Sequence, residues 1–282
     1  MMISIAIPSL NQARFLVEAL DSVFAQTGVD LQVAVMDGGS QDDSVAVIRR
    51  YEERLAYCRS HPDRGQAAAI NEGVDRLADA DYVGWLNADD LLLPRGLNRM
   101  ALYLEEHPQC VAVFGKAYVV DDAGRVIDEY PTCPFDRKRF SRTCTICQPA
   151  SLIRYRAWKA VGGLDETLQM CLDYDLWWQL SKVGSIGFLD EFVACSRDHK
   201  ATKTRMQKDR LYQEAFQVLQ RHLWYVPLRW CLSEAAYAWR VAHGGKRASS
   251  LVSQVLCGWR ALNRYFRVNR LSGLINAMHS PR

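Results

Sequence analysis

The strongest constraint on the fold is an alternation of short apolar segments with amphipathic segments in the first hundred residues. The apolar segments have the length and composition of buried strands, at residues 3–7, 31–36, 55–58 and 82–86. In the stretches between them, apolar residues recur every three or four positions, which is typical of helices. Strands separated by helices predict successive right-handed βαβ units, and therefore an α/β fold with a mostly parallel sheet.

Three of these predicted strands are followed by a turn that carries aspartate, namely 37–40, 63–65 and 87–90. The carboxyl ends of parallel strands lie on one edge of a sheet, so these carboxylates should converge there. A helix cap explains each aspartate singly, and Asp89 and Asp90 have that alternative reading. Caps explain less well the glycines in the first two turns, which allow a ligand to approach the backbone closely.

Carboxylates at this edge are hard oxygen ligands, suited to Mg²⁺ or Mn²⁺ held jointly with a substrate diphosphate. The dinucleotide fingerprint GxGxxG and the phosphate-loop motif GxxxxGK[ST] do not occur in the chain. Two local expectations accompany this reading: Ser40 caps the second helix, and Pro94 lies in the first turn of the fourth.

The second part of the predicted body has a different pattern. Residues 116–120 and 125–127 predict an antiparallel hairpin, and 148–153 and 186–195 predict further strands. The intervening helix, 173–183, has a core-facing stripe that consists of Leu172, Leu176, Leu180 and Val183.

Asp173 and Asp175 lie about 200° apart around this helix, so only one of them can face a site. The other is expected to be solvated or to act as a cap. If Asp173 is in the first turn, the helix dipole favours its ionised form.

The 282-residue chain has nine scattered cysteines, an odd number that favours a reduced environment. The lone CxxC at 144–147 lacks a second ligand pair at convincing spacing for zinc. No stretch resembles a signal peptide or a membrane-spanning helix, so we expect a cytoplasmic location, with attachment at the inner face of the membrane as an option.

Charge is distributed unevenly along the chain. Residues 205–282 contain thirteen Lys or Arg and three Asp or Glu, whereas the rest of the chain is net acidic. We expect a catalytic domain at 1–205 and a basic, aromatic-rich helical extension at 206–282. Such an extension suits an anionic membrane surface. It equally suits packing on the body or in a homodimer. Nucleic acid is not expected, because no recognised nucleic-acid-binding fold is present.

Several short motifs occur in a fixed order, and together they carry a family resemblance. They are Pro8-x-x-Asn11, Met36-Asp37-Gly38-Gly39-Ser40-x-Asp42, Asp63-x-Gly65, Trp85-Leu86-Asn87-Ala88-Asp89-Asp90, Gln148-Pro149-Ala150, and Gly162-Gly163-Leu164-Asp165-Glu166 through Asp173-Tyr174-Asp175-Leu176-Trp177. The ordered set, over roughly residues 2–205, resembles the inverting family 2 glycosyltransferases. The resemblance implies the GT-A fold, a Rossmann-like sheet flanked by helices.

The resemblance implies a role for each matching residue. Those expected around the nucleotide and the donor sugar are Pro8, Asn11, Asp37, Asp63, Gln66, Asn87, Ala88 and Gln148. Asp37 would accept a hydrogen bond from the base, Asp63 would lie near the base or ribose, and Gln148 would contact donor sugar or acceptor. Asp89 would bind the metal, and His199 would be a second ligand or a diphosphate contact. Asp173 matches the position of the catalytic base.

The chain departs from the family pattern at Asn87, which replaces the first Asp of the DxD motif. An amide can still bond a ribose hydroxyl, but one negative charge near the cation is lost.

The implied activity is metal-dependent transfer, with inversion, of a sugar from a nucleotide-sugar donor to a hydroxyl. We expect Mn²⁺ or Mg²⁺ as cofactor, a UDP-sugar as donor and a glycan or lipid-linked acceptor, in cell-envelope or exopolysaccharide synthesis. This activity has two alternatives. A catalytically weakened binding module of the same fold is suggested by Asn87. A sugar-phosphate nucleotidyltransferase would need a glycine-rich basic loop, and residues 9–14 contain one Arg and no Gly.

Overall fold

The computed structural model describes residues 1–77, 80–199 and 202–279, and for residue 204 and residues 270–279 it describes the backbone alone. The chain divides into two compact units. Unit 1 comprises Met1–Phe135 and Thr145–Thr202, and unit 2 comprises Asp136–Cys144 and Lys203–Arg282.

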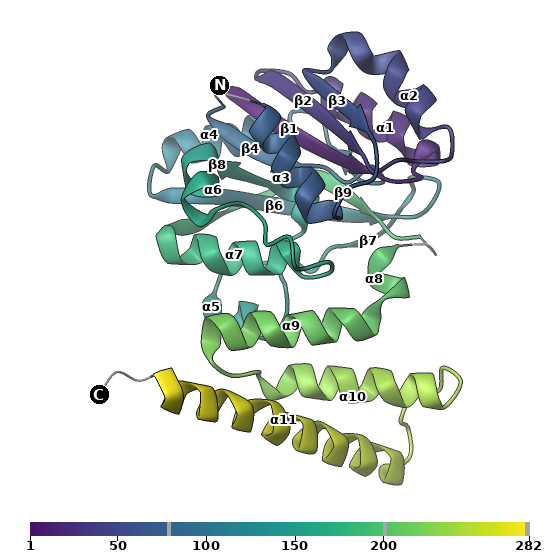
Figure 1. Ribbon diagram of the computed structural model, residues 1–282, viewed down its shortest axis with the longest axis vertical. Helices are drawn as coiled ribbons and strands as arrows, with labels where there is room; N and C mark the ends of the chain where they lie inside the picture. The colour runs from purple at the N-terminus through teal and green to yellow at the C-terminus, as the bar shows by residue number, and fades with distance from the viewer. Residues whose placement is uncertain (78–79, 200–201, 280–282) are drawn as a thin grey trace. The chain divides into compact units, whose positions relative to one another are not determined.

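Unit 1 is built around one mixed sheet with the strand order β3-β2-β1-β4-β8-β6-β9-β5, and β7 pairs with β6 (Figure 1). Its strands are β1 (Met2–Ser9), β2 (Asp30–Asp37), β3 (Tyr57–Ser60), β4 (Tyr82–Trp85), β5 (Leu91–Leu92), β6 (Cys110–Val120), β7 (Val126–Glu129), β8 (Ser151–Arg154) and β9 (Ser185–Arg197). Its helices are α1 (Ala13–Phe24), α2 (Ser44–Tyr51), α3 (Gln66–Arg76), α4 (Gly96–Glu106), α6 (Tyr155–Val161) and α7 (Leu172–Val183), with 3₁₀ turns η1 (Glu52–Arg54) and η2 (Gln148–Ala150).

The four N-terminal strands are parallel, as predicted, because a helix connects each strand to the next. The prediction of an α/β sheet flanked by helices is therefore confirmed. Beyond β4 the pairing changes: β8 is antiparallel to β4 and β6, whereas β6 and β9 are parallel. The predicted hairpin is also present, as an antiparallel pair of β6 and β7.

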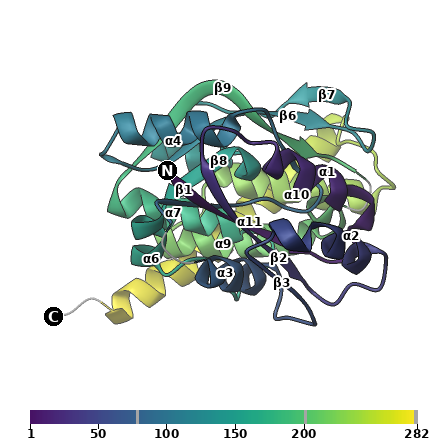
Figure 2. The same cartoon turned by 90° about the horizontal axis from the view of Figure 1, so that it is seen from above.

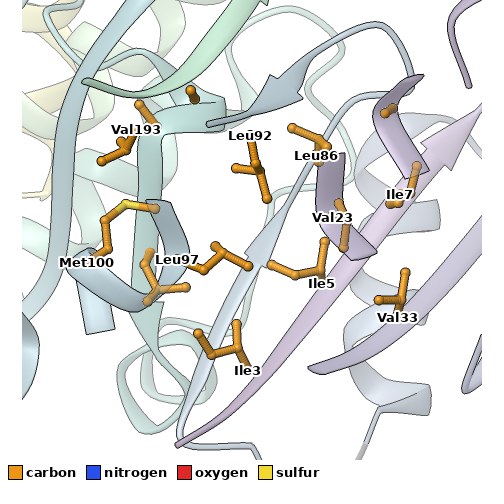
Figure 3. Packing of buried hydrophobic residues seen from close by; sticks show 14 of the residues in the cluster. Ile3, Ile5, Ile7, Val23, Val33, Leu86, Leu92, Leu97, Met100 and Val193 are labelled. Carbon is orange, nitrogen blue, oxygen red and sulfur yellow. The ribbon is translucent and has the colours of Figure 1, made fainter. Parts of the chain in front are cut away.

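Side chains of the parallel strands alternate between the two faces of the sheet, and each face has its own helices. One face packs on α1, α2 and α4 through a large cluster (Figure 3) that includes Ile3, Ile5, Ile7, Val23, Val33, Leu97 and Met100. The opposite face packs on α3 through a smaller cluster: Ala34, Met36, Ala69 and Leu77. Figure 2 shows α3 on the other side of the sheet from α1 and α4.

Some local predictions were wrong. The short strand β5 was not predicted, because two residues are too few to give a periodic pattern. Its presence moves the start of α4 to Gly96, so Pro94 precedes the helix. Ser40 does not cap α2, which begins at Ser44. Val183, at the end of α7, is 49% exposed rather than part of the core-facing stripe.

Unit 2 is helical and consists of α5 (Arg137–Phe140), α8 (Lys203–Met206), α9 (Lys208–Leu223), α10 (Leu228–Ala242) and α11 (Leu251–His279). In Figure 1, α10 lies between α9 and the long α11. The indole N–H of Trp230 donates to the carbonyl of Ser141, which links α10 to the segment around α5. No helix in the described part of the chain is long and apolar enough to cross a membrane.

Candidate active site

The turn after β2 is organised by the buried carboxylate of Asp37. In the sheet register, Asp37 lies between Ser9 at the end of β1 and Ser60 at the end of β3. Its Oδ2 accepts hydrogen bonds from the backbone N–H groups of Gly39 (3.1 Å) and Ser40 (2.8 Å) and from the Ser60 hydroxyl (2.6 Å). Its Oδ1 accepts one from the Ser40 hydroxyl. Among the described residues, Oδ1 accepts this single hydrogen bond, so one of its lone pairs is unused.

The loop after β1 is joined to this turn through Asn11. The Asn11 backbone N–H donates to the Ser40 hydroxyl (2.7 Å), and its Oδ1 accepts from the backbone N–H of Gln41 (2.8 Å). Asn11 has a φ of 54°, a left-handed conformation that asparagine tolerates better than most residues. Pro8 is buried within β1 just before this loop. The Asn11 side chain thus supports the neighbouring turn.

Arg59 links the turns after β2 and β3. Its guanidinium side chain is 5% exposed and donates to the backbone carbonyl of Asp37 (2.8 Å), and it forms ion pairs with Asp63 (3.2 Å) and Glu72 (3.0 Å). The second Asp63 oxygen accepts from the backbone N–H of Gly65 (2.8 Å). Gly65 has a φ of 114°, which strongly favours glycine. Two of the three predicted aspartate turns are therefore physically joined.

The third turn is joined to the second by side-chain amides. Gln66, at the start of α3, donates through Nε2 to Oδ1 of Asn87 (2.8 Å). The Asn87 Nδ2 group donates to Asp90 (2.9 Å) and to Oε1 of Gln148 (3.3 Å). Gln148 in turn donates to the backbone carbonyl of Trp85 at the end of β4 (2.7 Å). The three predicted turns thus form one connected edge.

This network gives a physical reason for asparagine at position 87. Asp90 is 4% exposed, and its other carboxylate oxygen accepts from the backbone N–H of Arg197 (2.9 Å). Burial, together with the negative charge of Asp89, raises the pKa of Asp90 to about 7. An amide at position 87 donates to this carboxylate, whereas a carboxylate there would repel it.

The side chains of Asp89 and His199 are in hydrogen-bond contact at this edge. The Asp89 Oδ2 atom lies 3.0 Å from Nε2 of His199, and the two side chains are 18% and 7% exposed. The His199 ring packs on Phe15, and its backbone N–H donates to the hydroxyl of Thr202 (2.9 Å). The buried Arg197 guanidinium donates to the Asp89 carbonyl (2.9 Å), which fixes the backbone that carries the carboxylate.

The pair fits a divalent cation only as part of a larger ligand set. No group of three or more His, Cys, Asp or Glu side chains suited to a metal occurs among the described residues. A carboxylate and an imidazole are appropriate ligands for Mn²⁺, and such ions are often held by one or two protein ligands and by substrate phosphates. Asp89 and His199 therefore fit a cation whose remaining ligands come from a bound diphosphate and water.

Asp173 lies in the first turn of α7, as predicted, but its electrostatics differ from the expectation. Burial raises the pKa of its carboxyl to about 6, which outweighs the opposing effect of the hydrogen bond from the backbone N–H of Tyr174 (2.7 Å). The side chain makes no hydrogen bond with another side chain among the described residues. The carboxylate is thus available to accept a proton near neutral pH.

Asp175 is wholly buried and accepts from Nε2 of Gln179 (2.6 Å). The expectation that the second aspartate of this pair would be solvated or a cap was wrong. The hydrogen bond from Gln179 compensates the burial of the carboxylate.

Hydrogen bonds connect Asn11, Asp37, Asp63, Gln66, Asn87 and Gln148 into the edge, and Asp89 and His199 lie beside them. Ala88 is buried within the third turn and offers its backbone alone. The sequence analysis placed Asp90 in the third turn, with a helix cap as its alternative, and gave no structural role to two organising residues, Arg59 and Arg197. The available signal was charge within or next to an apolar strand, because such charges are kept only when they are paired.

Comparison with solved structures defines the fold. S. aureus TarS in complex with UDP-GlcNAc aligns with a TM-score of 0.64 at 16% identity, over 97% of this chain and 75% of that one. The mannosyltransferase PcManGT from Pyrobaculum calidifontis, in complex with GDP-Man and Mn²⁺, aligns with a TM-score of 0.62 at 17% identity, over 96% and 86%. The fold is therefore the GT-A glycosyltransferase fold.

The family follows from the sequence itself. The model "Glycosyl transferase family 2" matches residues 4–160, more than half of the chain, so this chain belongs to family 2 of the glycosyltransferases.

Among curated relatives, Escherichia coli chondroitin synthase is 25% identical over 78% of this chain, and Pasteurella multocida hyaluronan synthase is 29% identical over 67%. This chain spans one third and one fifth of the length of these two relatives. An uncharacterized glycosyltransferase from Methanocaldococcus jannaschii is 23% identical over 85% of this chain and 84% of its own length.

Proposed function

We propose that unit 1 is an inverting glycosyltransferase that moves a sugar from a nucleotide-sugar donor to an acceptor hydroxyl. The observation that carries the proposal is the Asp89–His199 pair, 3.0 Å apart, next to the amide network at the carboxyl edge of the sheet. This is where open α/β sheets bind their ligands. The catalytic domain expected at residues 1–205 differs from unit 1, which ends at residue 202 and lacks residues 136–144. The extension, residues 206–282, is proposed to have another task.

In the proposed reaction, Asp173 acts as the general base. It accepts the proton of the acceptor hydroxyl while that oxygen forms a bond to the anomeric carbon and the bond from this carbon to the diphosphate oxygen breaks. The products are the glycosylated acceptor and a nucleoside diphosphate. A pKa of about 6 keeps Asp173 ionised at neutral pH, close enough to 7 for efficient proton transfer.

The nucleotide would occupy the joined turns. In this proposal Pro8 and Asn11 line its pocket, the free capacity of Asp37 Oδ1 receives a base N–H, and Asp63 lies near the ribose. The donor sugar lies toward the network formed by Gln66, Asn87 and Gln148.

We assign the cation, Mn²⁺ or Mg²⁺, to Asp89 and His199. When bound with the diphosphate, the cation would stabilise negative charge on the leaving group. Imidazole favours Mn²⁺ over Mg²⁺.

A UDP-sugar is the proposed donor, supported by the fold shared with TarS, which was solved with UDP-GlcNAc. PcManGT was solved with GDP-Man, so the experiment must include both bases. The proposed acceptor is a glycan or a lipid-linked glycan of the cell envelope, supported by the two polysaccharide synthases among the relatives.

The extension, with its net positive charge, is proposed to hold the enzyme at an anionic membrane surface, where a lipid-linked acceptor would be found. This location would be the inner face of a cytoplasmic membrane.

The test is a thermal-shift series with UDP, GDP, CDP and ADP, each with and without Mn²⁺, on the wild type and Asp89→Ala. A ligand that binds only the folded state increases the free energy of unfolding, by about 2.7 kcal/mol at a ligand concentration of one hundred times its Kd. The melting temperature rises as a result. We expect the largest shift for UDP with Mn²⁺, and its loss in Asp89→Ala. Glu191→Ala, which changes an exposed side chain of β9, serves as a control that should keep the shift.

A metal-dependent shift with GDP alone would replace UDP as the donor nucleotide and keep the enzyme class. If no nucleotide shifts the melting temperature, the transferase proposal is wrong. Binding without turnover of any nucleotide-sugar would favour the weakened binding module.

A further inference from the structure

The long helix α11 has apolar residues on two opposite sides. Ala261 and Val268 are buried within unit 2. On the other side, apolar residues recur every three or four positions and remain exposed: Leu251, Val255, Trp259, Leu262 and Phe266. Leu251 is 77% and Trp259 67% exposed. We call these five residues the outer stripe. Its spacing places all of them on one face of the helix.

A groove of about 700 Å³ lies between α10 and α11 at the border of this stripe. Aromatic and basic side chains line it, among them Trp239, His243, Trp259, Arg260, Arg264 and Arg267. The Trp239 and His243 rings stack on each other, with centroids 3.8 Å apart. The three arginines follow one another at intervals of four and three residues, so they form a single row along α11.

The charge of the groove is poorly balanced by the protein. Glu234 is the one acidic residue that lines it, and its nearest contact with Arg260 is 3.9 Å, too long for a hydrogen bond. The Nε atom of Arg264 is buried without a hydrogen-bond partner among the described residues. Guanidinium groups match phosphate oxygens with two parallel hydrogen bonds, so this row is suited to a phosphate group.

The combination of a basic groove with an exposed apolar stripe fits a lipid better than other partners. The sequence after Glu234 contains eight Lys or Arg and no Asp or Glu, so two copies joined through α11 would repel each other. Nucleic acid would engage the arginines but would leave the aliphatic stripe exposed to water. A bilayer surface receives both, since its headgroups are anionic and its interface accepts Leu, Trp and Phe.

We propose that the α10–α11 groove binds the phosphate headgroup of an anionic lipid while the outer stripe of α11 enters the interfacial layer of the same membrane. This inference rests on the proposed membrane docking of the extension and assigns the residues and the ligand chemistry to it. It does not depend on the transferase activity.

The test is flotation of the full chain with vesicles of phosphatidylcholine, with and without phosphatidylglycerol. The wild type should bind the anionic vesicles selectively. Arg260→Gln with Arg267→Gln removes two exposed groove arginines, and Arg229→Gln with Arg247→Gln removes two exposed arginines outside the groove. Both pairs lose the same charge. We expect the groove pair to weaken binding about tenfold more than the control pair, because only the groove pair removes phosphate hydrogen bonds.

A second comparison addresses the stripe. Val255→Glu with Leu262→Glu places two charges on exposed positions of the stripe, and Val126→Glu with Ile127→Glu places two on exposed positions of β7. The stripe pair should abolish flotation and the β7 pair should not. Circular dichroism and nucleotide thermal shifts verify that each variant is folded.

The outcomes separate the proposals. Equal loss in both arginine pairs would overturn the groove as a headgroup site and keep membrane docking. Absence of flotation by the wild type would overturn membrane docking, and full flotation by the stripe pair would overturn insertion of the outer stripe. Both outcomes leave the transferase proposal intact. If inorganic pyrophosphate in solution raises the melting temperature of the wild type but not of the groove pair, the groove is a site for free phosphate. A dimer that only the stripe pair disrupts would make the stripe an interface between copies.

Discussion

The side-chain oxygen of Asn87 accepts a hydrogen bond from Gln66, and its side-chain nitrogen donates one to the buried Asp90. We expect Asn87→Asp to destabilise the protein by about 1–3 kcal/mol at pH 8, because it leaves two carboxylates in contact and removes a donor. The cost should shrink at pH 5, where the two carboxylates can share a proton. Urea unfolding at both pH values measures it.

The control for this prediction is the exchange of the two residues. In the double variant Asn87→Asp with Asp90→Asn, the new amide at 90 can donate to the new carboxylate at 87 and still accept from the Arg197 backbone. Most of the lost stability should return. A double variant no more stable than Asn87→Asp would show that direct repulsion is not the cause.

The pKa of Asp173 makes a second prediction at the scale of the residue. Because a base must be ionised, kcat/KM should fall about tenfold per pH unit below an apparent pKa of about 6 and level off above it. Asp173→Asn should lower kcat by a factor of about 10²–10⁴.

Asp173→Asn should lower activity but raise the stability of the folded protein. The folded-state pKa of Asp173 is raised above the ordinary value of 3.8, so above that value the charge favours the unfolded state. Removing the charge at pH 8 should therefore raise stability, by ~1 kcal/mol because solvent still reaches the carboxyl. Asp175→Asn is the comparison, and it should lower stability, since it replaces a buried hydrogen-bond acceptor. A base role for Asp173 would be contradicted by a pH profile that Asp173→Asn leaves unchanged.

At the scale of elements, Arg59 joins the ends of β2 and β3 to α3. Arg59→Met should cost about 3–5 kcal/mol, because it leaves Asp63 and a backbone carbonyl without their cation. Arg76→Met is a matched control: Arg76 is exposed and lies 4.0 Å from the same Glu72. Its loss should cost under about 0.5 kcal/mol. Chemical denaturation of both variants decides whether the buried guanidinium has the inferred role.

The secondary-structure elements could be predicted from the sequence to a large extent, but their order in the sheet could not. The first four strands were predictable, because regular helical spacing separates compact apolar runs, and the register then brings Asp37 beside Ser60. Asn87 and Gln66 were both assigned to the site before the fold was known, but their mutual hydrogen bond depends on the sheet order, which periodicity does not contain. Arg59 and Arg197 were missed for the same reason: a buried arginine is recognised by its partners, and these come from distant parts of the chain.

For the molecule as a whole, unit 2 includes residues 136–144, far in sequence from its other helices. A chain that ends at residue 202 should therefore expose Phe140, which is fully buried in the 282-residue chain, and leave the Ser141 carbonyl without Trp230. We expect increased binding of a hydrophobic dye and aggregation on heating.

Replacing residues 136–144 by a Gly-Ser linker in the shortened chain should reverse the dye binding and preserve the nucleotide-dependent thermal shift. If the shortened chain behaves like the full protein without this replacement, residues 136–144 do not belong with the C-terminal helices. The sequence pattern had no signal for this association, since it joins residues as far apart along the chain as Ser141 and Trp230.

The Asn87–Asp90 contact also has a consequence for how the family motif can change over time. A single substitution that restores aspartate at 87 passes through a less stable protein, while a simultaneous change at 90 avoids the penalty. Descent should therefore couple the two positions: lineages with Asp at the first should have lost the carboxylate at the second or gained a cation beside it. An alignment of close relatives in which positions 87 and 90 vary independently would contradict this coupling.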